Sequence, residues 1–469
     1  MAQVDVWARE VSAQRASAMG CGDSKVGRPS SAKTSGHASS RTDAPRVAAP
    51  SPDVEQTHRP MVTEDESLRK MMEIMAGDRF AQNGTPEQRA AAELQQAVAD
   101  AAESASDETK KMVSRSWGGN GGPAMEALLQ NTSLIDVNYY VALIQANGTL
   151  PRWQDIPECA KIGPSNVWRL RSWDHCLSLP VICLTYCWLS SEHPDPVGEQ
   201  MKAVFPIFKA MLDYTRKEHG EHATIGILQD YASYPQVPRT DEESERFFRG
   251  LKTELNLWYT HPFTHVLMIN TPASERPEHT NRRPYEQRGW CYVEKHLSAI
   301  VKDKHCLWDF SKYQGCSHSD AVSAVFDMRQ QMEANRPPMV SPDRVAEEMR
   351  ANVESGGLAF TSNADMDFVI HLYERGFRRA FDTYVTTSGR HFIEQKLLGW
   401  GDREARLIAE ALRYVQAKCT PEETLMIDLR GNNWGPDGGR AIKDAAEGQD
   451  GGGGKRRFNV RVQGHHCPA

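Results

Sequence analysis

The residues best suited to chemistry lie between Tyr285 and Glu294, where the sequence reads YEQRGWCYVE. Apolar residues then recur with the spacing of a helix that buries one face, at Trp290, Val293, Leu297, Ile300 and Val301. Glu294 borders this stripe, so its carboxylate loses hydration unless a neighbour pairs with it. An acid in such a place is a candidate for catalysis. The alternative is an ordinary helix acid that pairs with Arg288 or Lys295.

The elements that would position Glu294 are apolar strands that alternate with amphipathic helices. Strands are expected at 180–189, 224–230, 263–270 and 305–310, and the helices between them include one that begins near 288. This alternation predicts an α/β fold with an open, mostly parallel, doubly wound sheet. Ligands of such sheets bind at the carboxyl ends of the strands. Tyr186, Trp188 and Asp230 stand at those ends, so we expect them to share one rim with the start of the Glu294 helix.

The cysteines do not form an obvious reactive site in the sequence. The chain has 10 cysteines without a CxxC pair, which is typical of a reducing, intracellular compartment. Cys183 and Cys187 fall in an apolar strand and are interpreted as core residues. Cys291 stands at a helix start, where a thiol can be nucleophilic, but no histidine is placed by the sequence to activate it. No metal site is expected, because no cluster of ligands has zinc spacing.

Composition changes along the chain divide it into seven segments. Hydrophobic residues make up 39% of the chain, which is low for a globular protein and indicates that part of its length is unfolded. We expect a disordered arm (1–84), a helical segment (85–116), a Gly-rich linker (117–123), a bracing segment (124–177), an α/β domain (178–385), a repeat segment (386–448) and a flexible tail (449–469).

Charge and hydropathy restrict the partners and the location. The net charge is −7 with both signs mixed, which argues against a nucleic-acid partner. No apolar run is long enough to span a bilayer, so a cytoplasmic location is expected. The segment from Met19 to Lys25, MGCGDSK, would be a lipidation signal if translation began at Met19. Gly20 and Cys21 would then carry acyl chains and attach the protein peripherally to a membrane.

A repeated pattern marks the C-terminal segment. Residues 400–411 and 434–445 match at Trp, Gly, Arg, Ile, Ala and an acid, with an offset of 34 residues. The second copy follows TLMIDLRGN, which ends at Asn432. This arrangement resembles the ribonuclease-inhibitor class of leucine-rich repeat, in which a short strand ending in Asn precedes a helix. Two copies rarely stand alone, so the resemblance implies a small α/β appendage that docks on the preceding domain.

Three stretches of the α/β domain resemble TIR domains and heterokaryon-incompatibility (HET) domains. Val181–Leu189 resembles the first strand of both. The run LQDYASYPQ, which begins at Leu228, is similar to a HET segment in which a strand ends in Asp. Arg288–Glu294, RGWCYVE, is similar to the Trp-Cys-x-x-Glu segment of plant-type TIR domains and to the Arg-x-Trp-x-x-x-Glu segment of HET domains. The resemblance implies a flavodoxin/TIR-like sheet and a role in signalling.

The resemblance also implies a reaction. Enzymatic TIR domains cleave NAD between nicotinamide and ribose, and their catalytic acid follows Trp-Cys, a position that Glu294 occupies here. Asp230 would support the reaction at a ribose hydroxyl. The groups expected to hold the nucleotide are Tyr186, Trp188, Trp290 and Arg288. NAD would be a substrate, and no cofactor is expected. The alternative is a non-catalytic scaffold that self-associates and binds protein partners through the α/β domain and the repeats.

Overall fold

The computed structural model describes residues 84–174, 178–333, 336–360, 362–421, 423–447 and 458–462. The arm predicted for 1–84 and the Met19 lipidation motif therefore lie outside the described residues, apart from Gly84. In the described part of the chain, no helix combines the length and hydrophobicity needed to cross a membrane.

The centre of the fold is a six-stranded sheet in the order β2-β1-β4-β3-β5-β6. The four strands that the sequence predicts run parallel to one another, and they are β3 (Val181–Tyr186), β4 (Gly226–Leu228), β5 (His265–Ile269) and β6 (Leu307–Asp309). The segment expected only to brace the domain adds two more strands, β1 (Leu134–Asp136) and β2 (Lys161–Ile162). β1 runs antiparallel to β4 and to β2. The expected α/β architecture with a mostly parallel sheet is confirmed.

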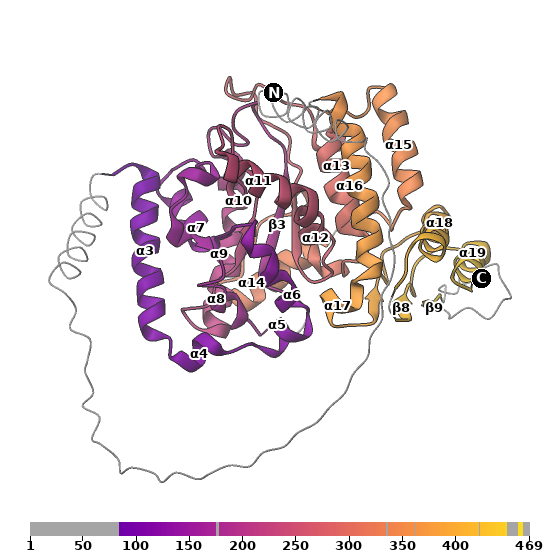
Figure 1. Cartoon of the computed structure of the whole chain (residues 1–469), viewed down its shortest axis with the longest axis horizontal. Helices are drawn as coiled ribbons and strands as arrows, with labels where there is room; N and C mark the ends of the chain where they lie inside the picture. Colours follow the sequence, from indigo (N-terminus) through magenta and orange to yellow (C-terminus); the bar gives the residue numbers. More distant parts are fainter. Residues whose placement is uncertain are drawn as a thin grey trace, which may run out of the picture. The chain divides into compact units, whose positions relative to one another are not determined.

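Helices cover both faces of the sheet because successive strand residues point to opposite sides. Val181 and Cys183 of β3 join one core cluster, whereas Ile182 and Leu184 join the other. The first cluster holds α12 (Leu255–Thr260), α13 (Gly289–Ala299) and α16 (Asn363–Asp382). The second holds α7 (Val137–Gln145), α9 (Glu199–His219) and α14 (Ala321–Met332). α13 and α16 contact each other on the first face (Figure 1).

Shorter helices complete the domain. A π-helical turn at Gly250–Glu254 directly precedes α12 and separates it from the helix Asp241–Arg249. The remaining α-helices of the part that is described from 84 to 388 are α3 (Pro86–Ser104), α4 (Asp107–Lys111), α5 (Arg115–Gly119), α6 (Gly122–Glu126), α8 (Trp168–Arg171), α10 (Asp230–Ser233), α11 (Asp241–Arg249), α15 (Pro342–Glu354) and α17 (Tyr384–Ser388).

The predicted linker at 117–123 is wrong, because this stretch is packed into the fold. Trp117 lies in α5 and only 2% of it is exposed. A Cβ atom on Gly122 would come within 2.4 Å of the Trp117 ring. The glycine therefore permits close packing against an indole, whereas the sequence pattern had indicated flexibility.

A second, smaller parallel sheet forms the C-terminal part of the described chain. Its strands lie in the order β7 (Phe392–Glu394), β8 (Leu425–Asp428) and β9 (Phe458–Arg461). The helices α18 (Asp402–Lys418) and α19 (Pro436–Glu447) connect them and pack together. The prediction of a flexible tail from 449 is wrong at β9, which pairs with β8 along its whole length. Alternating Phe458 and Val460 supply the buried side of that strand.

Asn432 joins the two strand–helix copies through four hydrogen bonds. Its side-chain oxygen accepts from the backbone N–H groups of Leu398 (2.9 Å) and Trp400 (3.3 Å). Its side-chain nitrogen donates to the carbonyl oxygens of Leu429 (2.8 Å) and Gln395 (3.1 Å). The side chain is completely buried, so no water can replace these partners.

Replacing Asn432 by alanine is therefore expected to lower the free energy of unfolding by about 2–3 kcal/mol, because buried backbone groups lose their partners. The neighbouring Asn433 is exposed and provides a matched control, for which a change within about 0.5 kcal/mol is expected. Urea unfolding of the two alanine variants measures both values. Equal effects at the two positions would show that the Asn432 bonds do not stabilise the appendage.

Candidate functional site

The start of α13 is fixed by backbone contacts that come from far along the chain. Gly289 donates its N–H to the Ala359 carbonyl (3.0 Å), and Ala359 donates to the Gln287 carbonyl (2.9 Å). A Cβ atom on Gly289 would lie 2.1 Å from the Phe360 ring, so only glycine fits at this close approach. These contacts hold the helix that carries Glu294 against the core.

Arg288, at the N-cap of α13, serves the same purpose with its side chain. Its guanidinium donates to the carbonyl oxygens of Arg283 (2.8 Å), Trp188 (2.8 Å) and Asn281 (2.9 Å). The sequence prediction assigned Arg288 to nucleotide binding. In the structure its hydrogen bonds go to main-chain oxygens, so it positions the loops after β3 and β5 beside α13.

Glu294 lies beside the carboxyl end of β3, and its surroundings disfavour its charge. Burial raises its pKa to about 8, and the nearby charge of Asp230 adds to the rise. Interactions with the hydroxyl groups of Thr185 and Tyr259 oppose it. Part of the Glu294 surface remains accessible to solvent, whereas Thr185 and Tyr259 are buried. Among the described residues Glu294 has no ion-pair partner, so the alternative of a pair with Arg288 or Lys295 is not what the structure shows.

Asp230 begins α10 directly after β4 and is held by three donors. The Tyr186 hydroxyl and the Trp188 indole (3.3 Å) donate to its carboxylate, as does the backbone N–H of Tyr231 (2.7 Å). Burial raises the pKa of Asp230, while the three hydrogen bonds oppose the rise. The structure thus brings together Tyr186, Trp188 and Asp230, as expected from their places at the strand ends.

Aromatic rings line the Asp230 side of this rim. The Trp188 and Tyr231 rings meet edge to face with centroids 5.6 Å apart. The His193 ring also packs edge to face on Tyr231, with ring centroids 4.9 Å apart. Trp188 is partly exposed, so its ring can present a surface to a planar ligand. Tyr231 and His193 were not among the residues singled out from the sequence, although Tyr231 directly follows the predicted strand end.

Trp290 was expected to join this aromatic wall, but the structure places it elsewhere. Its ring packs against Phe368 of α16, with centroids 6.2 Å apart. The physical reason is the helical turn of about 100° per residue. Because Cys291 points toward β3 and contacts Tyr186, its neighbour Trp290 turns toward the next layer of helices.

A loop that carries both arginines and glutamates connects β5 to α13 and follows the same rim. Within it His279 is buried, and its ring lies near Ser274 and the Glu199 carboxylate, which anchors the loop to the start of α9. Arg276, Arg282 and Arg283 of this loop are exposed, and Arg276 pairs with Glu199 (3.3 Å). The rim therefore combines two acids, an aromatic surface and a nearby set of cations.

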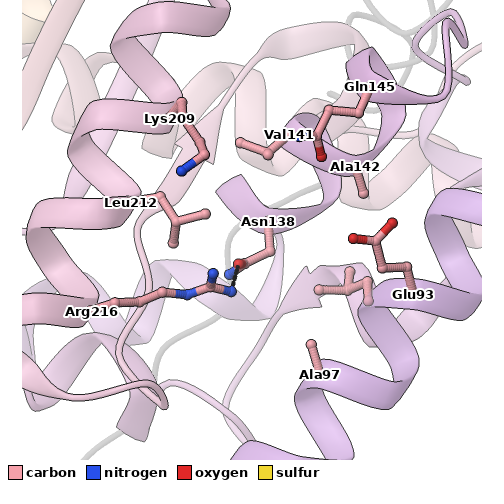
Figure 2. A pocket seen from close by; sticks show the side chains of 10 residues that line it. Glu93, Ala97, Asn138, Val141, Ala142, Gln145, Lys209, Leu212 and Arg216 are labelled. Atoms are coloured by element: carbon pink, nitrogen blue, oxygen red, sulfur yellow. Dashed lines mark hydrogen bonds between the residues drawn. The ribbon is translucent and has the colours of Figure 1, made fainter. Parts of the chain in front are cut away.

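A cavity of about 210 Å³ lies away from these acids, among α3, α7 and α9 (Figure 2). Leu94, Val141 and Leu212 form its apolar part, and Lys209 and Arg216 of α9 line one wall. Lys209 is paired with Asp213, and Arg216 is bound to Asn138 (2.6 Å), so both cations already have partners.

Comparison of this chain with protein-family models, with curated proteins and with solved structures finds no match.

Proposed function

We propose that the α/β domain is a TIR/HET-like signalling domain in which Glu294 cleaves NAD at the bond between nicotinamide and ribose. The observation that carries this proposal is the placement of two acids, Glu294 and Asp230, beside the carboxyl end of β3, where burial raises the pKa of Glu294 to about 8. Perturbed acids of this kind concentrate at functional sites.

The topology supports a ligand at this rim. Across the sheet, the four parallel strands lie in the order β4-β3-β5-β6. Counted by their order in the sequence, this is second, first, third, fourth, which is the start of the flavodoxin-like order. In that order the connections leave β3 toward opposite sides of the sheet, and ligands bind in the crevice that results. β3 carries Thr185 on the Glu294 side and Tyr186 on the Asp230 side, so both acids flank this crevice.

The reaction would use these residues as follows. When the bond breaks, its electron pair passes to the nicotinamide nitrogen and cancels the positive charge of that ring. The ribose carbon becomes positive, and the ionised Glu294 stabilises it until water adds. Asp230 accepts a hydrogen bond from a ribose hydroxyl, and Trp188 stacks on the departing ring. Arg282 and Arg283 supply positive charge for the pyrophosphate.

The pH dependence tests this mechanism. Only ionised Glu294 stabilises positive charge, and its pKa is about 8. We therefore expect the rate of nicotinamide release to rise about tenfold per pH unit below 8 and to level off above it. Chromatography of free nicotinamide over a series of buffers measures the profile, with buffer lacking protein as the control for hydrolysis by base. A rate independent of pH, or one that falls as pH rises, would exclude Glu294 as the ionised group.

A scaffold function is the second candidate, and the C-terminal appendage favours it. The Asn432 bonds between two strand–helix copies support a leucine-rich-repeat-like organisation. Such repeats bind proteins along their sheets. In this case protein partners and self-association would be the activity, and wild-type protein would leave NAD intact at every pH. For either function we propose a cytoplasmic location, with peripheral membrane attachment through Gly20 and Cys21 if translation starts at Met19.

A further inference from the structure

Two cysteines meet between the end of β3 and the first turn of α13. Cys187 follows Tyr186, the last residue of β3, and Cys291 is the third residue of α13. Both side chains belong to the same core cluster, and each thiol influences the pKa of the other. The Cys291 sulfur also lies 3.4 Å from the Tyr186 carbonyl oxygen, which fixes its position independently. The two residues are 4% and 3% exposed, so they are shielded from large reagents but separated from the surface by little protein.

The environment divides the pair into a nucleophile and a partner. The pKa of Cys187 lies below its ordinary value, first because of the hydrogen bond with Cys291 and then because of the charge of Arg288. The pKa of Cys291 lies well above its ordinary value, because of the same hydrogen bond and its burial. By contrast, burial raises the pKa of Cys183 to about 12. Thiolates are the reactive form of cysteine, so Cys187 is the sulfur suited to attack an oxidant.

We propose that Cys187 and Cys291 form a reversible disulfide in response to a peroxide, and that this bond regulates the site by moving Glu294. The regulation rests on the proposed function, but the disulfide itself does not. The Cys187 thiolate attacks one oxygen of the peroxide, the O–O bond breaks and hydroxide leaves, which forms a sulfenic acid. The Cys291 sulfur then attacks the Cys187 sulfur, the S–O bond breaks, and water leaves with the Cys291 proton. Two sulfurs are oxidised and one peroxide is reduced.

The geometry gives the bond a direct effect on the acid. A disulfide is about 2.05 Å long, which is shorter than a contact between two thiols, so oxidation draws the first turn of α13 toward β3. Glu294 is three residues after Cys291 and lies on the same side of the helix. The oxidised protein should therefore have a displaced Glu294.

The test compares the reduced and the peroxide-treated full chain. Free thiols are alkylated in denaturant, the protein is digested, and mass spectrometry searches for the peptide pair that joins Cys187 to Cys291. Nicotinamide release is measured at pH 9, where Glu294 is ionised in both forms and only its displacement affects the rate. We expect the joined pair, a rate lower by at least about tenfold, and recovery with a thiol reductant.

Variants separate this pair from other buried thiols. Cys187→Ser and Cys291→Ser should each abolish the joined peptides and the sensitivity to peroxide. Cys183→Ser is the matched control within β3, where the sulfur faces the Trp258 carbonyl (3.6 Å), and it should behave like the wild type. Absence of the joined peptides from oxidised wild-type protein, or an unchanged rate at pH 9 despite their presence, would overturn the proposal.

The same experiment distinguishes failure of the proposed function from failure of the disulfide proposal. If the reduced protein releases no nicotinamide, NAD cleavage is wrong. In that case the presence or absence of the joined peptides tests whether the disulfide forms, and hydrogen exchange of the α13 amides tests whether the helix moves. Unchanged exchange of these amides in the oxidised protein would exclude a movement of α13.

Discussion

Glutamine in place of Glu294 is expected to reduce nicotinamide release from NAD by at least about 100-fold at pH 9. Glutamine has nearly the same shape as glutamate but cannot carry the negative charge that stabilises the positive ribose. Chromatography of nicotinamide under conditions of excess NAD measures the loss. Glu286→Gln is the matched control, because Glu286 is an exposed acid shortly before α13, and it should retain the wild-type rate. Equal release by the Glu294→Gln and wild-type proteins would remove Glu294 from the mechanism.

The same substitution should stabilise the fold at high pH. The pKa of Glu294 rises from an ordinary value of 4.5 to about 8 in the folded protein, so the folded state keeps a proton that the unfolded state has lost. Stability of the wild type therefore falls as pH rises through this interval. Glu294→Gln has no ionisable group at this position and so avoids this loss of stability. It should therefore be more stable than the wild type at pH 9, by up to a few kcal/mol. A structural acid with a favourable ion pair would give the opposite sign.

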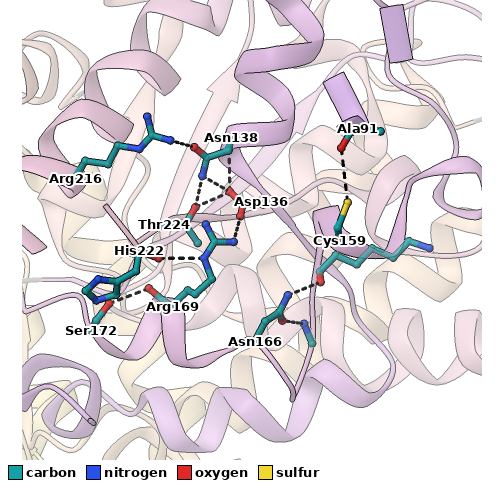
Figure 3. A network of polar contacts seen from close by, with 12 residues as sticks. Ala91, Asp136, Asn138, Cys159, Asn166, Arg169, Ser172, Arg216, His222 and Thr224 are labelled. Atoms are coloured by element: carbon teal, nitrogen blue, oxygen red, sulfur yellow. Dashed lines mark hydrogen bonds and ion pairs between the residues drawn. The ribbon is translucent and has the colours of Figure 1, made fainter. Parts of the chain in front are cut away.

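Alanine in place of Asp136 is expected to lower the free energy of unfolding by about 3–5 kcal/mol. Asp136 ends β1, is completely buried and pairs with the buried Arg169 (Figure 3). Its carboxylate also accepts from the backbone N–H (2.9 Å) and side chain (2.7 Å) of Asn138 and from the Thr224 hydroxyl (2.6 Å). Removal of the acid leaves an unpaired buried guanidinium and several donors without an acceptor.

Urea unfolding measures this loss, and an exposed ion pair of the same segment provides the control. Arg152 and Asp155 are in contact (2.6 Å), with side chains 36% and 55% exposed. Asp155→Ala should change the free energy of unfolding by less than about 1 kcal/mol, because solvent screens such pairs. A similar small effect at Asp136 would show that the added strands β1 and β2 are not held by the buried pair.

The sequence was sufficient where local periodicity reflects the fold. The apolar runs before Tyr186 and Asp230 predicted parallel strands, and the rule that ligands bind at strand ends predicted that these residues share a rim. Glu294 was recognisable because it borders the apolar stripe of α13. That position explains its desolvation, since Val293 and Leu297 on either side are buried.

Other features depend on contacts between distant segments, which no local pattern encodes. β1 is only three residues long, so its membership of the sheet depends on pairing with β4. The glycines around 117–123 have the composition of a linker, and only the packing of Trp117 shows otherwise. Tyr259, whose hydroxyl lowers the pKa of Glu294, comes from a different helix, and Cys187 approaches Cys291 only when β3 and α13 come together. Trp290 was misplaced because spacing gives the face of a helix but not which neighbour covers it.

The most direct test of the central claim is the product analysis of NAD incubated with the full-length wild-type protein at pH 9. If Glu294 at the end of β3 cleaves the bond between nicotinamide and ribose, free nicotinamide and ADP-ribose should accumulate in equal amounts and faster than in buffer alone. Intact NAD after prolonged incubation with folded, reduced protein would contradict the claim and favour the scaffold function.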